Sequence, residues 1–232
     1  GYVGLITGIG FAKLNHQVSI VDLNDDLIKN LNENRPPFYE PELVDYLNDS
    51  NIRNNLFFST SYQKSINENT DIVFVCVQTP TDPDTGKTKT DYISSVLTEL
   101  KKIESFNFII CIKSTIKATL VEKISNEIDL DYKKIIFNPE FLREGSAFYD
   151  FFNPDRIVIG GSDQKGLNQC TELYKSFDCE KIITDSNSSQ MIKYLSNTYL
   201  AMRLSFVNET YRLVSEFNGC LLYTSDAADE TT

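Results

Sequence analysis

The residues most able to do chemistry lie in one stretch, NPEFLREGSAFYDFFNPDRIVIGG, which spans 138–161. Glu140 and Glu144 are two acids with Arg143 between them, a combination suited to binding or transforming a polar ligand. The stretch follows an apolar run at 135–137. Loops that leave the end of a buried strand are where open α/β sheets bind ligands. The same residues also suit an ordinary strand–helix connection with solvated charges, and their types alone leave both interpretations open.

A second candidate pair, Lys193 and Asn197, lies in a run from 186 to 217 that contains no glycine or proline. This run predicts one helix of roughly thirty residues, which is longer than most. Residues four apart share a helix face, so a Lys and an Asn one turn apart can jointly hold a carboxylate or a developing oxyanion. Two exposed polar residues on a solvated face would give the same pattern.

The chain opens with a glycine-rich segment, GYVGLITGIGFAKL, which predicts the start of a helix. The next run, 17–22, predicts a strand that ends in Asp22. Glycine turn, helix, strand and terminal acid are most of a dinucleotide-binding fingerprint, in which the acid binds ribose hydroxyls and favours NAD over NADP. No strand precedes Gly1, and the first glycine of the fingerprint is absent. A helix with packing glycines is therefore the alternative interpretation.

Strand and helix patterns alternate along the rest of the chain. Strands are expected at 17–22, 55–59, 70–77, 108–112, 135–137, 157–161 and 181–184. Helices are expected at 25–32, 42–47, 92–103, 119–128 and 166–177. This alternation predicts an α/β fold with a doubly wound parallel sheet, followed by the long helix. We expect a first domain over residues 1–185 and the connecting helix over residues 186–219.

Composition narrows the function classes. The chain has 232 residues, 41% of them apolar, which supports a folded core and argues against disorder. Its net charge of -11 argues against a nucleic-acid binder, because phosphate backbones need basic faces. Five cysteines without a CxxC pair suggest a reducing, cytoplasmic compartment. No apolar run is long enough to predict a membrane span, and no His/Cys/Asp cluster predicts a metal site.

The last segment, 220–232, continues no helix or strand pattern. Its sequence, CLLYTSDAADETT, looks like the translation of a sequencing-library adapter. We expect it to be a non-native tail that has no part in the fold.

Several segments together resemble the nucleotide-sugar dehydrogenase family, and within it the UDP-glucose 6-dehydrogenases most. They are GYVGL at Gly1, VD at Val21, YEPEL at Tyr39, QTPT at Gln78, KST at Lys113, NPEFLREGSA at Asn138, NPDRIVIGG at Asn153 and KYLSNTYLAMRLSFVNE at Lys193. The resemblance covers 1–219. It implies a Rossmann-like fold, here with its first strand missing, and NAD as the cofactor. It also implies UDP-glucose as the substrate, oxidised to UDP-glucuronate in two successive hydride transfers that serve polysaccharide biosynthesis, and a homodimeric full-length parent.

The resemblance implies a role for particular residues. The implied NAD contacts are Gly1, Val3, Gly4, Asp22, Thr79, Thr115 and Glu144. The implied sugar-nucleotide contacts are Glu140, Phe141, Leu142, Arg143, Glu144, Lys193 and Asn197. Among these, Glu140 would assist hydrolysis of a thioester, Lys193 and Asn197 would stabilise an oxyanion, and Thr115 would hold a water near the reacting carbon. These four are the implied catalytic residues.

The chain departs from the family pattern in two places. The motif G-x-G-G-x-C-x-P-K-D, which holds the nucleophilic cysteine of the family, is absent, and so is the UDP-binding second domain. We therefore expect a chain truncated at both ends and inactive by itself. Two alternatives remain: a dehydrogenase for another nucleotide sugar, of the GDP-mannose or UDP-N-acetylmannosamine type, or a non-catalytic nucleotide-binding fragment. The run NPDR at 153–156 favours UDP-glucose over GDP-mannose.

Overall fold

The computed structural model describes residues 1–103 and 107–219, so the predicted tail at 220–232 lies outside the described residues. Its contacts divide the chain into two compact units, Gly1–Gln190 and Met191–Thr232. The long helix α10 (Ser186–Glu216) begins in the first unit and continues in the second.

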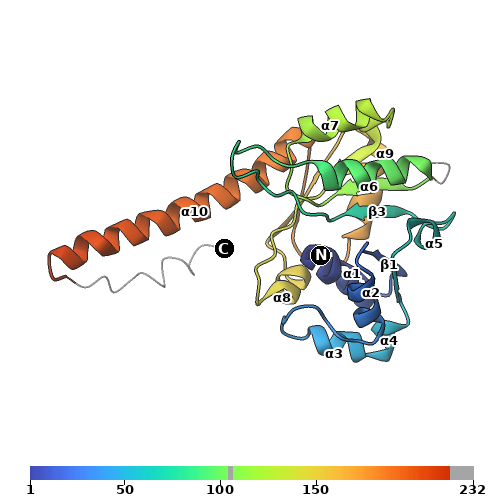
Figure 1. The fold of residues 1–232 in the computed structure, drawn as a ribbon, viewed down its shortest axis with the longest axis horizontal. Helices are drawn as coiled ribbons and strands as arrows, with labels where there is room; N and C mark the ends of the chain where they lie inside the picture. The colour runs from blue at the N-terminus through green and yellow to red at the C-terminus, as the bar shows by residue number, and fades with distance from the viewer. Residues whose placement is uncertain (104–106, 220–232) are drawn as a thin grey trace. The chain divides into compact units, whose positions relative to one another are not determined.

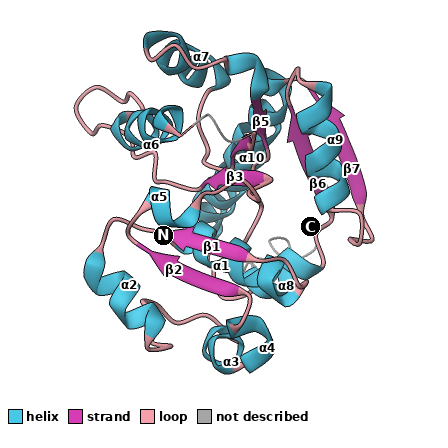
Figure 2. Cartoon of the chain, turned by 90° about the vertical axis from the view of Figure 1, so that its right-hand side faces the viewer, coloured by secondary structure: helices cyan, strands magenta, loops and turns pink. Residues whose placement is uncertain are grey.

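The first part of unit 1 forms a small parallel sheet with helices around it. Its elements are α1 (Tyr2–Lys13), β1 (Val18–Val21), α2 (Asp25–Asn32), α3 (Leu43–Asn48), α4 (Ser50–Arg53), β2 (Leu56–Ser59) and α5 (Tyr62–Ser65). Strands β1 and β2 lie side by side, with Val18 opposite Leu56 (Figure 2). Helix α1 is apolar on nearly all sides and is buried from Leu5 to Ala12, as expected of a helix enclosed by other elements.

A five-stranded sheet follows, in the order β3-β4-β5-β6-β7. Its strands are β3 (Ile72–Val75), β4 (Ile109–Ile112), β5 (Ile135–Phe137), β6 (Arg156–Gly160) and β7 (Glu180–Thr184). The connecting helices are α6 (Asp91–Lys102), α7 (Ala118–Glu127), the 3-10 turn η1 (Tyr132–Lys134), α8 (Ala147–Phe152) and α9 (Gln164–Leu173). The pairs β3–β4, β4–β5 and β6–β7 are parallel. The predicted α/β class with a long C-terminal helix is confirmed.

Helices cover both faces of this sheet, because successive side chains of a buried strand point to opposite sides. In β4, Ile109 and Cys111 pack in the core shared with α1, α8 and α9, whereas Ile110 and Ile112 pack in the core shared with α6 and α7. Figure 1 shows α6 and α7 on one side of the strands and α1 and α8 on the other. The continuous apolar strands seen in the sequence are therefore buried on both faces.

The sheet departs from parallel pairing at one junction. Strand β6 runs antiparallel to β5, with Phe137 opposite Gly160. A parallel neighbour needs a crossover that returns the chain to the other end of the sheet, usually through a full helix. The connection 138–155 instead holds a loop and the six-residue helix α8, so β6 starts near the end of β5 and runs back. The short helices α4, α5 and α8 were not predicted, because few residues carry their periodicity.

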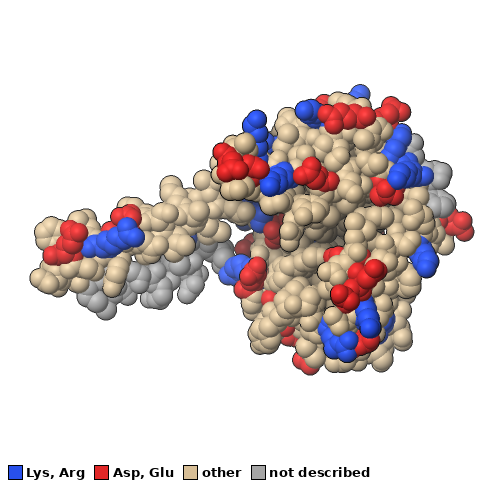
Figure 3. All heavy atoms as spheres, in the orientation of Figure 1, with Lys and Arg blue, Asp and Glu red and all other residues tan. Residues whose placement is uncertain are grey.

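The surface of the described residues carries both signs of charge. On the face drawn in Figure 3, Lys and Arg side chains lie interspersed with Asp and Glu side chains. No helix of the described residues is both long enough and apolar enough to cross a membrane.

Candidate cofactor and sugar-nucleotide site

The two halves of the dinucleotide fingerprint meet at the start of α1. Asp22 follows the last residue of β1, and its Oδ2 lies 3.0 Å from the nitrogen of Gly1. Its Oδ1 accepts a hydrogen bond of 3.1 Å from the backbone N–H of Asn24, which in turn caps α2 through a bond from the N–H of Leu27. The first N–H groups of a helix have no partner within the helix and attract anions. The arrangement therefore places an acid beside a helix N-terminus, the two groups that the fingerprint predicts for a ribose and a diphosphate.

An apolar cavity of about 160 Å³ opens at the same place. Its lining comes from α1, β1, α2 and the proline-rich loop that follows α2, namely Gly1, Tyr2, Leu5, Ile20, Asp22, Leu27, Leu31, Pro37 and Phe38. Small-molecule sites are mostly apolar with a few placed polar groups, and here Asp22 is the charged one. Apolar walls and one acidic acceptor are the kinds of group that the base and ribose of an adenosine need.

The first turn of α1 also lies close to the end of β3. A Cβ at Gly4 would come within 3.3 Å of Cβ of Cys76, so only glycine allows this spacing without displacement. Val3, the third predicted cofactor contact of this turn, is half-buried beside it. The close approach brings the helix end toward the carboxyl edge of the sheet, where α/β folds bind their ligands.

Thr79 and Thr115 are brought together at this edge. The hydroxyl of Thr79, after β3, donates a hydrogen bond of 2.7 Å to the carbonyl oxygen of Thr115, after β4. The Ser114 hydroxyl donates one of 2.6 Å to the carbonyl oxygen of Val77. Two predicted cofactor contacts from distant parts of the sequence thus belong to one hydrogen-bonded edge.

The acidic loop after β5 is ordered by its own carboxylates. Glu140 accepts a hydrogen bond of 2.6 Å from the N–H of Leu142. Asp150 accepts bonds of 2.8 Å from the backbone N–H of Arg143 and of 3.2 and 2.8 Å from its Nε and Nη2. This fork-like pairing raises the pKa of Arg143. The guanidinium is therefore engaged within the loop, and the sequence prediction that Arg143 contacts the sugar nucleotide stays untested.

The remaining predicted residues of this loop differ in exposure. Phe141 is half-buried, with the guanidinium of Arg156 stacked 4.8 Å from its ring centre. Leu142 packs against the core shared with α1 and α8. Glu140 is half-buried, whereas Glu144 is exposed. The apolar pair thus anchors a loop whose two acids are accessible to a ligand.

Sequence reasoning missed a buried polar network beneath this loop. Asn138 accepts hydrogen bonds of 2.9 Å from the Lys113 ammonium and 2.7 Å from the Tyr174 hydroxyl, and donates one of 2.9 Å to the carbonyl oxygen of Val158. Burial, together with nearby cysteines, raises the pKa of Tyr174 well above its ordinary value. The network joins the ends of β4 and β5 to β6 and α9. The motifs KST and NPEF contain Lys113 and Asn138, but neither motif indicates that these two side chains are hydrogen-bonded.

Lys193 and Asn197 lie on α10 within the second unit. They are four residues apart on a regular helix and so share a face, as predicted. Whether they reach Glu140 stays a prediction from the sequence. The start of α10 belongs to unit 1, where Oε1 of Gln190 accepts a hydrogen bond of 3.2 Å from the N–H of Ile116, the residue after Thr115.

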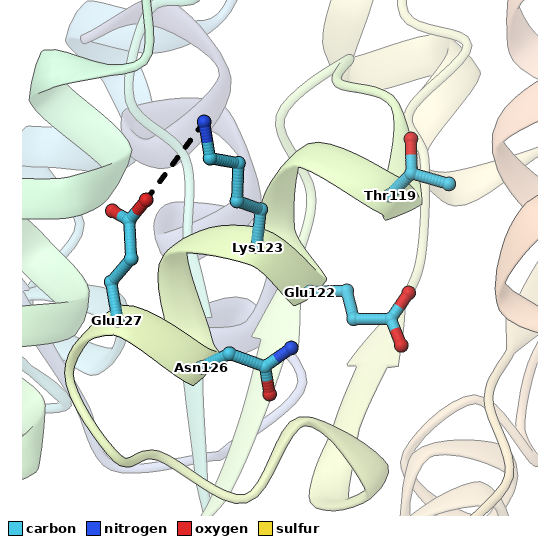
Figure 4. A pocket seen from close by; sticks show the side chains of 5 residues that line it. All are labelled: Thr119, Glu122, Lys123, Asn126 and Glu127. Atoms are coloured by element: carbon cyan, nitrogen blue, oxygen red, sulfur yellow. Dashed lines mark ion pairs between the residues drawn. The ribbon is translucent and has the colours of Figure 1, made fainter.

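One other hollow has no chemistry attached to it. Its five lining side chains all come from α7, as Figure 4 shows, and the pair Lys123–Glu127 spans 3.9 Å across exposed helix surface. Within the residues that the structure describes, no group of three His, Cys, Asp or Glu side chains could hold a metal ion.

Comparison with known proteins agrees with this geometry. Residues 1–178 match the family model described as the NAD binding domain of the UDP-glucose/GDP-mannose dehydrogenase family. A UDP-glucose 6-dehydrogenase of Bacillus subtilis is 35% identical over 217 residues, which are 90% of this chain and 48% of that protein. The chain thus spans about half the length of the curated relatives it matches.

Solved structures share the fold. A UDP-glucose dehydrogenase from Pyrobaculum islandicum superimposes with a TM-score of 0.83 at 34% identity, over 92% of this chain and 51% of that one. A GDP-mannose dehydrogenase from Pseudomonas aeruginosa, solved as a ternary complex, gives a TM-score of 0.88 at 27% identity, over 99% and 54%. The chain therefore belongs to the UDP-glucose/GDP-mannose dehydrogenase family, and residues 1–178 are its NAD-binding domain.

Proposed function

We propose that the chain is the cofactor-binding part of an NAD-dependent dehydrogenase that oxidises UDP-glucose to UDP-glucuronate in two successive hydride transfers. The observation that supports it best is the position of Asp22, which lines an apolar cavity together with Gly1 and Tyr2 at the start of α1. This is the geometry that a dinucleotide needs at its adenosine end and its diphosphate.

NAD, when bound, supplies the acceptor for the hydride. The N-terminal N–H groups of α1 hold its diphosphate, because they have no partners in the helix and carry partial positive charge. Asp22 accepts hydrogen bonds from the ribose hydroxyls and, by repulsion, disfavours the 2′-phosphate of NADP. Thr79 and Thr115, linked across the strand ends, line the path from this site toward the sugar loop.

The sugar nucleotide lies against the loop after β5. Glu140 is half-buried and accessible, and it assists proton transfer during hydrolysis of the acyl intermediate. Thr115 holds the attacking water, and Glu144 contributes to the cofactor end of the loop. Lys193 and Asn197, one turn apart on α10, stabilise the developing oxyanion through charge-assisted donors. These roles follow from the similarity of the motifs at 113–115, 138–147 and 193–209 to the family.

UDP-glucose is proposed over other nucleotide sugars on two grounds. The B. subtilis relative named for UDP-glucose is 35% identical, whereas the GDP-mannose structure is 27% identical. The sequence also carries NPDR at 153–156, where GDP-mannose enzymes tend to differ. A GDP-mannose dehydrogenase is the second candidate, because its structure superimposes over nearly the whole chain.

Calorimetric titration of the purified chain tests the cofactor assignment. We expect NAD to bind at least tenfold more tightly than NADP, and equal affinity would contradict the role of Asp22. Addition of UDP-glucose and NAD tests the second part. The sequence lacks the cysteine motif of the family. We therefore expect no sustained four-electron oxidation of UDP-glucose by this chain, measured as formation of NADH. Sustained turnover with GDP-mannose, or with UDP-glucose, would refute that expectation and identify the sugar directly.

A further inference from the structure

Glu40 is a buried carboxylate that joins two segments of the proposed site. It lies within the proline-rich run RPPFYEP at 35–41 and is only 3% exposed. Its Oε2 accepts a hydrogen bond of 2.8 Å from the Tyr2 hydroxyl and one of 2.9 Å from the N–H of Gly145. Its Oε1 accepts one of 2.8 Å from the N–H of Ala147. The two amides lie more than one hundred residues along the chain from their acceptor.

Burial of a carboxylate is unfavourable by several kcal/mol unless hydrogen bonds replace its water. Glu40 has three such bonds, and their lengths of 2.8–2.9 Å are those of charge-assisted donors. Burial and the bond to Glu40 raise the pKa of Tyr2, so its hydroxyl stays a donor. The nearby Glu42 is exposed and receives only the hydroxyl of Tyr46 in its own helix region. Glu40 therefore has a geometry that its neighbour does not share.

The contacts of Glu40 add a long-range anchor to the turn at Gly145, beside the burial of Ala147 and Phe148 in the core shared with α1. Gly145 has a φ of +87°, and no atom lies within 4 Å of the position that its Cβ would take. The turn there is closed by a hydrogen bond of 3.1 Å from the Ser146 N–H to the carbonyl oxygen of Arg143. Glutamate 144 precedes Gly145 directly and is exposed. The bonds to Glu40 therefore hold the turn that carries Glu144 at a point where a glycine turn by itself is permissive.

We propose that Glu40 is a positioning residue that ties the loop carrying Glu140 and Glu144 to the cofactor-binding turn of α1 through Tyr2, so that NAD binding and the order of that loop are coupled. This rests on the function proposed above. Coupling between two sites is reciprocal, so a ligand that holds the Gly1–Gly4 turn in place also slows opening of the loop. The carboxylate is the shared acceptor through which both segments act.

The test combines NAD affinity with exchange of single amides by NMR on the 232-residue chain. In the wild-type chain we expect NAD to slow hydrogen exchange at Gly145 and Ala147. In Glu40→Gln we expect exchange at both amides to be at least tenfold faster without NAD, NAD binding to be about tenfold weaker, and the NAD-dependent slowing to be lost. The matched control, Glu42→Gln, has the same substitution two residues away and is expected to equal wild type.

Tyr2→Phe separates positioning from simple support of the fold. It removes the link to α1 but leaves the two amide bonds to Glu40, so exchange without NAD should stay slow while the response to NAD falls. A full NAD response in Tyr2→Phe overturns the proposal, and this variant decides the matter if Glu40→Gln does not fold by circular dichroism. Wild-type affinity and response in a folded Glu40→Gln also overturn it. If the wild-type chain binds no NAD, the proposed function fails. If hydrogen exchange at Gly145 and Ala147 without NAD is unchanged in Glu40→Gln, the positioning role of Glu40 is refuted independently.

Discussion

The hydroxyl of Thr79 donates a hydrogen bond of 2.7 Å to the carbonyl oxygen of Thr115, across 36 residues of sequence. Thr79 follows β3 and Thr115 follows β4, two parallel neighbours whose carboxyl ends meet at one edge of the sheet. The side chain of Thr79, a predicted cofactor contact, thus holds the backbone of Thr115, which is predicted to hold a water. The two residues therefore act as a unit, which has a measurable consequence.

Thr79→Val should loosen this edge. The change keeps the side-chain shape and removes the donor, so we expect unfolding free energy to fall by about 1 kcal/mol and NAD affinity to fall by about 3- to 10-fold. Urea unfolding and calorimetry measure the two effects. Thr98→Val is the matched control, because the Thr98 hydroxyl bonds only to the carbonyl oxygen of Ser94 within α6. An equal loss of NAD affinity in the control would show that the edge is not involved.

Asp22→Asn should change cofactor choice. Loss of the charge weakens the acceptor for ribose hydroxyls, because one neutral amide oxygen replaces a carboxylate, and it removes the repulsion of a 2′-phosphate. We therefore expect NAD to bind about tenfold more weakly and the preference over NADP to shrink. Titration of both cofactors measures the ratio. Asp26→Asn, on the exposed first turn of α2, is the control and should leave the ratio unchanged. An unaltered ratio in Asp22→Asn would remove Asp22 from the cofactor site.

Alanine at two glycines of α1 should affect stability to different extents. A Cβ at Gly10 would lie 2.3 Å from a ring atom of Phe151, whereas one at Gly8 would meet the end of the flexible Ile20 side chain at 2.6 Å. Alanine gains about 0.5–1 kcal/mol in a helix, and overpacking of a rigid ring costs about 1–3 kcal/mol. We expect Gly10→Ala to destabilise by about 1–2 kcal/mol and Gly8→Ala to change stability by under about 0.5 kcal/mol. Thermal or urea unfolding distinguishes them, and equal effects would contradict the packing.

Asn138→Ala should be strongly destabilising. It removes the acceptor of the buried Lys113 and Tyr174 groups and the donor to Val158, and buried polar groups that lose a partner cost about 1–3 kcal/mol each. We expect a loss of at least about 3 kcal/mol in urea unfolding. Asn168→Ala, whose exposed amide meets only Gln164 on α9, is expected to change stability by under about 0.5 kcal/mol. A small effect at Asn138 would indicate that the network contributes little to folding.

Stability should fall in alkali. Burial raises the pKa of Cys111 and of Tyr174 well above their ordinary values of 9.0 and 10.0. Both groups therefore stay neutral when folded, while the unfolded chain ionises them, so their stabilisation is complete below about pH 8 and is lost as pH rises past the ordinary values. We expect the melting temperature to drop steadily between about pH 8 and about pH 11. Tyr174→Phe should flatten that decline, and an unchanged slope would contradict the contribution of Tyr174.

The sequence by itself determined the class of fold, because its signal is local. Apolar runs such as Ile109–Ile112 and Ile135–Phe137 mark strands buried on both faces, and the alternation with helical patterns implies their parallel arrangement. The prediction of Asp22 as a cofactor contact also has a local basis, since Asp22 ends a strand after a glycine turn. The similarity of the motifs also identified the family. It gave no distances between the side chains on which the chemistry of the family depends.

Tertiary structure decided the contacts between distant segments. Two sets of hydrogen bonds join residues that lie far apart in the sequence, and nothing in the sequence indicates that they meet. They are the bonds of Glu40 to Tyr2 and Gly145 and the bonds of Lys113 and Tyr174 to Asn138. Each buried polar group had to find a partner wherever packing brought one, which no local pattern encodes. The reversed direction of β6 has the same origin, because chain geometry after β5, and not the apolar pattern of the strand, set its orientation.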